Sequence, residues 1–496
     1  MKRFQRRFQD RIAGIVAGPD RLLFRGTLRS ISHTEGLEKF MSASSILHKD
    51  FGRFTRSVTA QLCQAAENWA QRQGRPYQYL RSARMSKEDY ALEVARQEGI
   101  QEGLICVLAC MESCQTFRLR KNREEKKLEV VPHRGQCRHL YFYFLDREFG
   151  LMHVRLQTWM PYTIQVCLNG RAWLGGQMRA RGMQHQQQDN CFTQIADAPR
   201  AQQLMDGLPL RRWVARFKAW ARRVNPWLQS EQGRRLKPYY WSLRESEYAT
   251  DVLFRPDQLR QVYPLLVRHA MDQFTCYNVL RFLGKRRPAR CRSEVRSHLG
   301  EGPDGVRVKH WVGENSIKMY DKKGTVLRVE TTINNPRRFK VRRCNSQGEW
   351  MWMPLRKGIC DFRRRMGISQ AANSRYLEAL AAVVEPQPSC DLLDPLSQPV
   401  WHRGRRYRPL RPVSPDDAMR LQLLANEQFL LSGVSNRGLR ILWAEHPAAQ
   451  HGRGAVAGRV SRWLALMVAH RLLCRKPGTR RYWLTARGHQ VIAAVR

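Results

Sequence analysis

Long hydrophobic runs are missing from this sequence of 496 residues, although 43% of its residues are apolar. A helix that spans a bilayer needs about 20 consecutive apolar residues. The short apolar run at residues 12–17 is followed by Pro19 and Asp20, which does not fit a secretory signal. We therefore expect a cytoplasmic protein that does not cross a membrane and that is long enough to bury the cores of two to four domains.

Acidic residues are scarce relative to basic ones. The chain has 42 Asp and Glu against 87 Lys and Arg, which gives a formal net charge of +45 spread along the whole sequence. Such a charge predicts a polyanionic partner, and nucleic acid fits better than a membrane surface. Arg outnumbers Lys about fourfold, which suits bidentate phosphate and guanine contacts but is equally typical of a GC-rich genome.

Paired cysteine motifs are also missing. The 13 cysteines are odd in number, irregularly spaced and without a C-x-x-C pair, which predicts reduced thiols in a cytosolic protein. Cys106, Cys110 and Cys114 recur at every fourth residue, and Cys137 and His139 follow, so a metal site is one interpretation. Buried thiols are the interpretation that this spacing favours.

Residues 1–102 are expected to be mainly helical. Phe4, Phe8, Ile12 and Ile15 share one helical stripe with arginines around it, so this first helix either binds phosphates or, as we favour, docks on the core. A second helix is expected around residues 58–69. A third is expected after Ser86, whose neighbours fit a capping box.

Residues 103–384 are expected to form a central mixed α/β body, which makes the whole chain a multidomain α+β protein. Short alternating runs up to an Asn169-Gly170 turn predict a meander of strands, and residues 171–300 read as largely helical. Within the helical part, Trp213 and Phe217 recur among arginines, which indicates either a base-stacking surface or, more simply, a buried aromatic stripe with a solvated basic face. One cluster in the strand region also carries metal-ligand chemistry: His139, Asp146, Glu148 and His153.

A β-hairpin with an unusual charge pattern is expected at residues 316–333. Two β-rich runs flank Lys323-Gly324, a pair that suits a two-residue turn with positive φ angles. With that turn, alternation sorts the polar side chains onto two faces. One face then carries Asp321, Arg328 and Glu330, and the other carries Lys318, Tyr320 and Lys322. Such a strand pair is either solvated or holds a ligand.

Residues 385–415 are rich in Pro and Arg and are expected to be a linker. The remaining residues, 416–496, predict the order helix, helix, helix, strand, turn, strand, helix, with Ser435 as the N-cap of the second helix. In the third helix an apolar stripe that includes Trp463 leaves Arg459 and Arg462 facing outward.

This order of elements resembles the winged helix-turn-helix of bacterial regulators. The resemblance implies that the third helix enters the major groove of DNA with Arg459 and Arg462 near base edges. It also implies phosphate or minor-groove contacts from the basic residues of the wing, namely Arg475, Lys476, Arg480 and Arg481. Winged helices also serve as protein-docking modules, and the basic wing argues against that use here.

The central hairpin carries a second, shorter resemblance. Tyr-Asp-Lys at residues 320–322, followed by Arg-x-Glu at residues 328–330, resembles plasmid rolling-circle replication initiators of the Rep-trans type and, more loosely, filamentous-phage initiators. That likeness implies Tyr320 as the nucleophile and carboxylates that hold Mg²⁺ or Mn²⁺, with Asp321 and Glu330 as the catalytic carboxylates. It also implies that the cations on the hairpin, Lys318, Lys322 and Arg328, balance charge on the phosphorane.

Two features of the sequence count against that likeness. The chain lacks the His-x-His metal motif of many initiators. The two hairpin carboxylates are expected about 13 Å apart, so that a shared ion needs a third acid such as Asp146, Glu148 or Asp251. The competing interpretation pairs Arg328 with Glu330 on an exposed sheet face.

Together these patterns predict a nucleic-acid-binding protein from a bacterium or a mobile element, acting at a specific DNA site as a replication-initiator-like or nicking endonuclease. The alternative is a non-catalytic DNA- or RNA-binding protein, either a transcription regulator or the protein of a ribonucleoprotein. The composition and the motifs are compatible with DNA or RNA as the bound nucleic acid and with any oligomeric state.

Overall fold

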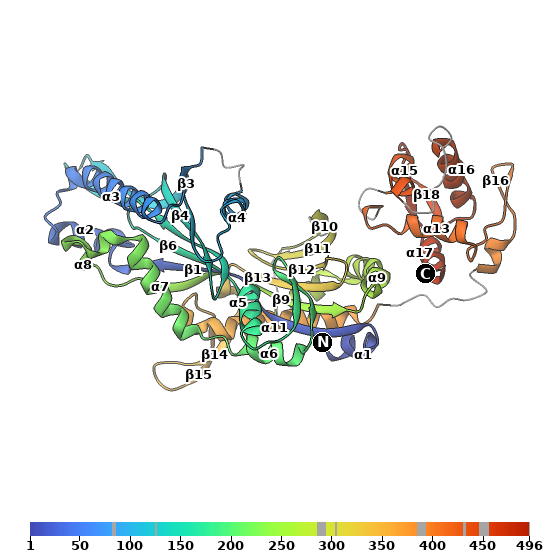
Figure 1. Ribbon diagram of the computed structural model, residues 1–496, viewed down its shortest axis with the longest axis horizontal. Coiled ribbons are helices and arrows are strands. Elements are labelled where there is room, and N and C mark those ends of the chain that lie inside the picture. The colour runs from blue at the N-terminus through green and yellow to red at the C-terminus, as the bar shows by residue number, and fades with distance from the viewer. Residues whose placement is uncertain are drawn as a thin grey trace. The chain divides into compact units, whose positions relative to one another are not determined.

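The computed structural model describes residues 1–81, 86–124, 126–284, 294–302, 305–383, 393–429, 433–445 and 456–495. Helices and strands are both abundant, so the chain is an α+β protein, as expected (Figure 1). The chain divides into two compact units. Unit 1 contains Met1–Ala13, Val252–Val329 and Ser374–Arg496, and unit 2 contains Gly14–Asp251 and Glu330–Asn373.

The main sheet has eleven strands in the order β10-β11-β12-β13-β9-β1-β6-β5-β4-β3-β2. Strands β9 and β13 contribute residues to both units. The bounds of the strands are β1 Ile12–Thr27, β2 Tyr77–Tyr79, β3 Gly103–Asn122, β4 Lys127–Asp146, β5 Gly150–Gln157, β6 Ile164–Asn169, β9 Tyr240–Phe254, β10 Val295–Gly302, β11 Gly305–Val312, β12 Asn315–Lys322 and β13 Val326–Ile333.

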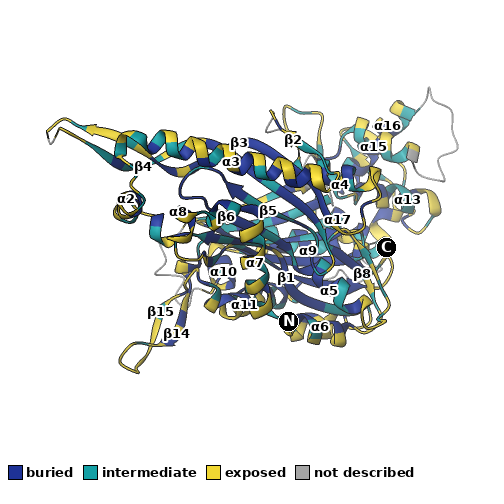
Figure 2. Cartoon of the chain, turned by 60° about the vertical axis from the view of Figure 1, so that its left-hand side comes forward, coloured by how far each residue is buried: buried dark blue, intermediate teal, exposed yellow. Residues whose placement is uncertain are grey.

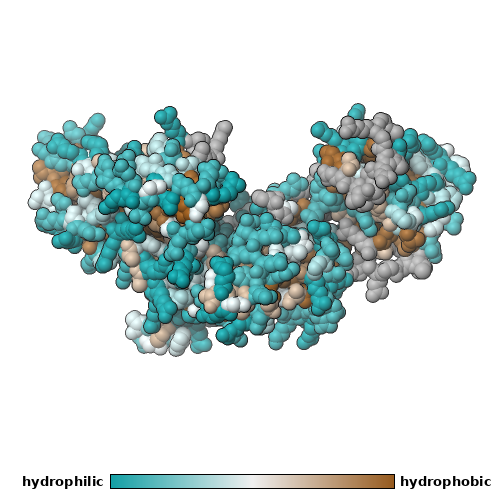
Figure 3. Space-filling model, viewed as in Figure 1, coloured by the Kyte–Doolittle hydropathy of each residue, from teal (hydrophilic) through white to brown (hydrophobic). Residues whose placement is uncertain are grey.

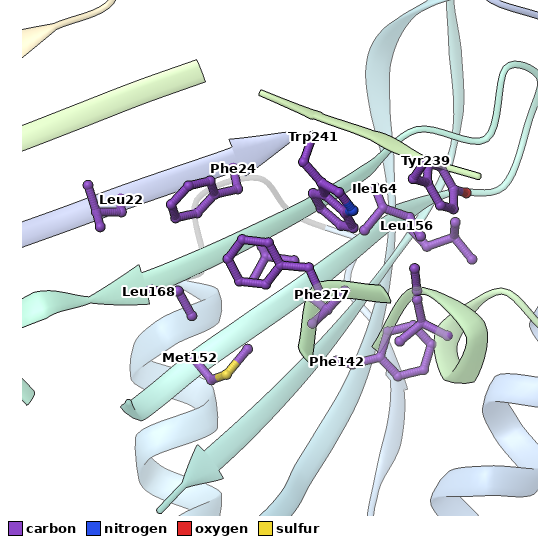
Figure 4. Close-up of a cluster of buried hydrophobic side chains, with 14 of the residues drawn as sticks. Leu22, Phe24, Phe142, Met152, Leu156, Ile164, Leu168, Phe217, Tyr239 and Trp241 are labelled. Atoms are coloured by element: carbon purple, nitrogen blue, oxygen red, sulfur yellow. The ribbon is translucent and has the colours of Figure 1, made fainter. Parts of the chain in front are cut away.

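Unit 2 packs helices against its strands around a large core that is rich in aromatic side chains. Phe24 of β1, Phe142 of β4 and Phe217 of the helix α7 meet there, together with Trp241 (Figure 4). Burying such large apolar rings stabilises this unit. Its helices are α2 Thr34–Ala43, α3 Phe51–Arg72, α4 Lys87–Gln97, α5 Gly170–Arg179, α6 Ala198–Asp206, α7 Leu210–Val224 and α8 Glu231–Arg234, followed by the first part of α11 Phe362–Leu380.

Two small hairpins complete unit 2. They are β7 His185–Gln188 with β8 Cys191–Ile195, and β14 Lys340–Cys344 with β15 Trp350–Pro354. The long helix α3 shows alternating buried and exposed positions along its length (Figure 2). This pattern is typical of a helix that packs one face on a sheet.

Unit 1 contains the helices α1 Lys2–Arg7, α9 Gln258–Gln273, α10 Cys276–Phe282 and the end of α11. It also contains the strands β10, β11 and β12. Strand β11 alternates strictly, with Val306, Val308, His310 and Val312 buried and the residues between them partly exposed. The His310 ring is held by Ser297 Oγ at 2.7 Å and by Tyr376 of α11 at 3.3 Å. One face of these strands is therefore covered by helices.

The C-terminal part of unit 1 has its own buried cluster, to which Leu396, Leu410, Leu421 and Trp463 belong. The elements are η7 Asp394–Ser397, β16 Val400–His402, β17 Arg405–Tyr407, α13 Pro415–Leu424, α15 Asn436–Glu445, α16 Val456–Ala469, β18 Leu473–Arg475, β19 Tyr482–Leu484 and α17 Ala486–Val495. Strands β18 and β19 pair in antiparallel fashion. The described elements follow the expected order, and Ser435 Oγ accepts the Gly438 amide at 3.1 Å, as expected of an N-cap.

Three expectations about the order of elements are wrong. The first helix ends at Arg7 and does not continue to Ile15, because β1 begins at Ile12, although residues 1–102 are otherwise mainly helical, as expected; Phe4 and Phe8 are buried, as docking of α1 requires. Residues 171–300 contain β9, a strand of fifteen residues. Asn169 does not form a hairpin turn but caps α5, because its side chain accepts the amides of Arg171 and Ala172.

The expected linker at residues 385–415 is partly folded. Its first residues lie outside the described part of the chain, but Leu396 and Leu410 are fully buried in the C-terminal cluster. Two short strands, β16 and β17, lie between them, and β17 carries Arg405 and Arg406. The few apolar residues of this segment could not form a core by themselves. They are buried because they pack into the core of the helices that follow in the sequence.

No helix in the part of the chain that the structure describes is long and apolar enough to cross a membrane. The described cysteines are free thiols. Helix α7 buries Trp213 and Phe217, while most of its arginines lie outside the core, so the simpler interpretation of this aromatic stripe is confirmed.

Acid should destabilise this fold through its buried histidines. Burial lowers the pKa of His310 from 6.5 to about 4, and burial likewise lowers the pKa of His139 to about 4. Each ring is neutral when folded, so its contribution to stability is complete above pH 6.5 and is lost as pH falls toward 4, because the unfolded chain takes up protons first. Each group can contribute up to about 3 kcal/mol over that interval.

Urea denaturation at several pH values between 7.5 and 4.5 measures this slope. The substitution His310→Gln should make the slope shallower, whereas His298→Gln, at an exposed histidine of the neighbouring strand, should leave it unchanged. Identical slopes for the three proteins would contradict the assignment to His310.

Candidate nucleic-acid interface and carboxylate site

The central hairpin forms as expected from residues 316–333. Strands β12 and β13 are neighbours in the sheet, and Lys323 and Gly324 between them have φ angles of 60° and 73°. Positive φ at consecutive turn residues is the conformation that a Gly-containing hairpin turn requires. The hairpin and the positive φ angles of its turn are thus confirmed, whereas the expected two-residue turn is wrong, because three residues connect the strands.

The expected sharing of one face by Asp321 and Glu330 is not what the structure shows. Asp321 lies beside Tyr263 of α9, whose pKa is raised by burial first and then by nearby carboxylates that include Asp321. Glu330 instead lies with Asp20 and Glu247. Three residues separate the two strands rather than two, and a shift of one residue exchanges the faces of a strand.

The alternative of a solvated face is also wrong. Asp321 is 6% exposed, Glu330 is 1% exposed and Arg328 is fully buried. Lys322 is buried as well, at 8% exposure. Arg328 and Lys322 therefore belong to the interior and not to a surface that contacts nucleic acid directly.

A cluster of three carboxylates is the main chemical feature of unit 2. Asp20 of β1, Glu247 of β9 and Glu330 of β13 each offer an oxygen, and these oxygens lie within 4.8 Å of one another. The three strands are consecutive in the sheet, and adjacent strands run about 4.8 Å apart, so side chains at one level of the sheet converge. The Asn190 amide donates to Asp20 Oδ2 at 2.8 Å.

The chemistry of this carboxylate cluster follows from its charge and its burial. Asp20 is 2% exposed and Glu330 is 1% exposed, and carboxylates at such distances repel unless protons or cations compensate them. Carboxylate oxygens are the ligands that Mg²⁺ and Mn²⁺ prefer. The cluster can therefore hold a hard divalent cation.

The acids expected to complete the metal site form ion pairs with arginines instead. Arg216 of α7 pairs with both Asp146 and Glu148. Asp251 pairs with Arg171 at 3.1 Å, and both side chains are buried completely or nearly so. These ion pairs connect helices to the sheet. The two acids that accompany Glu330 in the cluster are Asp20 and Glu247 instead.

Sulfur ligands converge at a second place in unit 2. The thiols of Cys114 and Cys137 lie 3.0 Å apart, and their ligand atoms and those of His139 fall within 4.8 Å of one another. The hydrogen bond from Cys137 lowers the pKa of Cys114, against the effect of burial. Cys106 and Cys110 do not join this group, and burial raises the pKa of each to about 12. His153 is not part of it either and packs against Tyr141 and Tyr143.

Lys318 and Tyr320 lie on the partly exposed side of β12 and belong to a basic and aromatic surface. The Lys318 ammonium sits 5.3 Å from the centre of the Tyr320 ring, a cation–π distance. In the adjacent strand Lys309 is opposite Lys318, and it lies 4.7 Å from the Trp311 ring. Lysine ammonium groups and aromatic rings thus alternate along this face.

The C-terminal helices place both predicted recognition residues at one groove. Arg459 and Arg462 of α16 line it, and the hairpin β16–β17 adds Arg405 and Arg406. Two further arginines of this groove, Arg408 and Arg420, are held by Asp417 at 2.7 and 3.2 Å. The buried carboxylate fixes these two guanidinium groups.

The predicted wing residues are exposed. Arg475 ends β18, Lys476 follows it, and Arg480 and Arg481 precede β19. The Arg475 side chain donates to the Thr479 carbonyl oxygen at 3.0 Å, which orders the turn. The surface in Figure 3 is mainly hydrophilic, in keeping with the high charge.

Sequence reasoning missed Asp20, Glu247, Arg405 and Arg406. The first two lie far from Glu330 in sequence and become neighbours only through strand order in the sheet. Asp20 follows Pro19, a pair that suggests a turn, although β1 continues through both residues. The arginines were present in a segment whose composition indicated a linker.

No protein-family model, curated protein or solved structure matches this chain.

Proposed function

We propose that the chain is a nucleic-acid-binding protein whose C-terminal residues form a winged helix. The groove with Arg405, Arg406, Arg459 and Arg462 is the observation that carries this proposal. Four guanidinium groups on two elements line one groove, and Arg is the residue that makes bidentate contacts to both phosphates and base edges.

The order of elements supports the same proposal. A short helix, α15, is followed by α16 and by the antiparallel pair β18–β19, as in a winged helix-turn-helix. In α16, Trp463 is buried and Arg462 is exposed, so the apolar stripe docks the helix and the basic stripe faces outward. In this proposal α16 reads the major groove and the basic wing contacts the backbone.

Salt dependence tests nucleic-acid binding directly. Affinity for duplex DNA should fall with a log–log slope steeper than about −3, since each neutralised phosphate contributes roughly −0.9. Replacing the wing cations Arg475, Lys476, Arg480 and Arg481 with Gln should make that slope shallower by about 2 to 4. A slope near −1 for the wild-type chain, measured by fluorescence anisotropy, would argue against a multi-contact interface.

A second candidate function is favoured by the carboxylate cluster. Asp20, Glu247 and Glu330 offer oxygen ligands to one ion, and a divalent ion can polarise a phosphodiester for attack. We propose on this basis a metal-dependent DNA-nicking activity like that of replication initiators. The resemblance to those initiators, and not the carboxylate cluster, is what suggests Tyr320 as the nucleophile, because Tyr320 belongs to unit 1 and the cluster to unit 2. If the cluster binds no ion, the non-catalytic DNA- or RNA-binding protein is the remaining function.

A further inference from the structure

The β14–β15 hairpin of unit 2 exposes large apolar side chains. Trp350 is 61% exposed, Trp352 is 49% exposed and Met351, between them, is 42% exposed. Figure 2 shows this hairpin extending from its unit with most of its surface in the colour of exposed residues. Exposed aromatic side chains gathered on one element are typical of a binding surface.

The strand register places both tryptophans on one side of the hairpin. Trp352 is opposite Arg342, Trp350 is opposite Cys344, and Lys340 is opposite Pro354. Because side chains alternate along a strand, Lys340 and Arg342 share the face of the two indole rings. The other face carries Val341 and Arg343, which are buried, and Met351 and Met353, of which Met351 is exposed. Aromatic planes and cations therefore occupy the same exposed face.

Several contacts that do not involve the tryptophans hold the hairpin in shape. In the loop, Asn345 Oδ1 accepts the amides of Gln347 at 2.9 Å and Glu349 at 2.8 Å. At the base, Arg343 pairs with the buried Asp361, and the Leu355 amide donates to Phe339 O at 2.8 Å. A rigid platform loses little conformational entropy when it binds a partner.

The positive charge around the hairpin indicates which kind of partner the hairpin binds. The exposed basic residues of the hairpin and its flanks are Arg337, Arg338, Lys340, Arg342, Arg356 and Lys357. The acid of the loop, Glu349, accepts a hydrogen bond from the Asn345 amide at 3.1 Å. An apolar protein partner would have to leave these cations beside its own apolar surface, whereas a polyanion with stackable rings satisfies both features.

We infer that the β14–β15 hairpin binds single-stranded nucleic acid by stacking bases on Trp350 and Trp352 while Lys340 and Arg342 contact the phosphates. This inference rests on the proposed nucleic-acid binding and adds a second interface to it. Bases in a duplex are already stacked on their neighbours, so the tryptophans recognise unpaired bases. Nothing in the stacking contact distinguishes DNA from RNA, because every base has an aromatic face.

The double variant Trp350→Ala/Trp352→Ala tests this inference. Anisotropy with fluorescein-labelled single-stranded DNA, single-stranded RNA and duplex DNA of the same sequence should show a loss of about 10- to 100-fold on the single strands and less than about threefold on the duplex. The variant Trp350→Phe/Trp352→Phe keeps aromatic faces and should retain most of the affinity. Leu47→Ala, at a residue 58% exposed elsewhere in unit 2, is the control for removal of exposed apolar surface.

The outcomes separate this inference from the proposed function. A wild-type chain that binds no nucleic acid overturns both. If the wild-type chain and the double Ala variant bind single strands with equal affinity, the inference about the hairpin is wrong and the proposed nucleic-acid binding stands. Equal single-strand affinity together with a change of oligomeric state in the Ala variant, measured by sedimentation, would show that the hairpin docks on a second copy of the chain.

Discussion

The double substitution Arg459→Ala/Arg462→Ala should reduce affinity for a duplex selected by the wild-type chain by about 30-fold or more, and affinity for a scrambled duplex far less. Each lost base contact is worth about 1–3 kcal/mol, whereas phosphate contacts from the wing persist. The measurement is a selection from random duplexes followed by anisotropy titrations on the selected and scrambled sequences. Equal losses on both would show that α16 does not read bases.

Two matched variants complete this test. Arg405→Ala/Arg406→Ala removes the other side of the groove and should weaken both duplexes, because the β16–β17 hairpin faces the same groove from outside the helix. Arg487→Ala removes an arginine of α17, outside the groove, and should change neither affinity by more than about twofold. A protein-docking role of the C-terminal helices predicts no effect of any of these variants on DNA.

Local signals were sufficient for the C-terminal elements and for the central hairpin. The stripe of Val460, Trp463 and Met467 has helical period and is buried. The Lys323-Gly324 pair occupies positive φ, which depends on its own residues and little on the rest of the chain. Such elements are predictable because each residue's preference agrees with the final structure.

Strands β1 and β9 could not be predicted in the same way. β9 begins with alternating exposed and buried residues and ends in a fully buried run, which is compatible with a helix when only its sequence is known. In β1 a helical stripe continued from Phe8 to Ile12 by chance, and Pro19-Asp20 suggested a break. Pairing with strands distant in sequence decided both cases.

The same reason explains the partial prediction of the carboxylate site. Glu330 was a candidate from its motif, but its neighbours Asp20 and Glu247 are set by the order β13-β9-β1. The register of the hairpin determines which face of the sheet carries Glu330. A turn of three residues instead of two moves Glu330 to the face opposite that of Asp321. Composition alone gives neither strand order nor register.

Replacing Glu330 with Gln should abolish binding of Mn²⁺ at the carboxylate cluster and any Mg²⁺- or Mn²⁺-dependent nicking of supercoiled DNA. The amide removes one of the three carboxylates that could hold an ion, so affinity should fall by more than the roughly 10- to 100-fold lost when an outer-shell partner is mutated. Asp20→Asn should act in the same way. Calorimetric titration with Mn²⁺ and agarose-gel analysis of the DNA measure the two effects separately.

A matched control lies on the same strand as Glu247. Glu245 pairs with Arg21 at 3.9 Å and is not part of the cluster, so Glu245→Gln should leave Mn²⁺ affinity and nicking within about twofold of wild type. If Glu245→Gln and Glu330→Gln weaken Mn²⁺ binding equally, the ion is held by diffuse surface charge and the cluster is a set of arginine-compensated acids.

Tyr320→Phe distinguishes the nucleophile from the metal. It removes one oxygen and keeps the ring that Lys318 covers, so fold, DNA affinity and Mn²⁺ binding should be unchanged. A covalent product between the chain and a labelled DNA strand should disappear, because the phenolic oxygen forms that bond. Nicking that continues in Tyr320→Phe without a protein-linked strand would assign the attack to water at the carboxylate cluster.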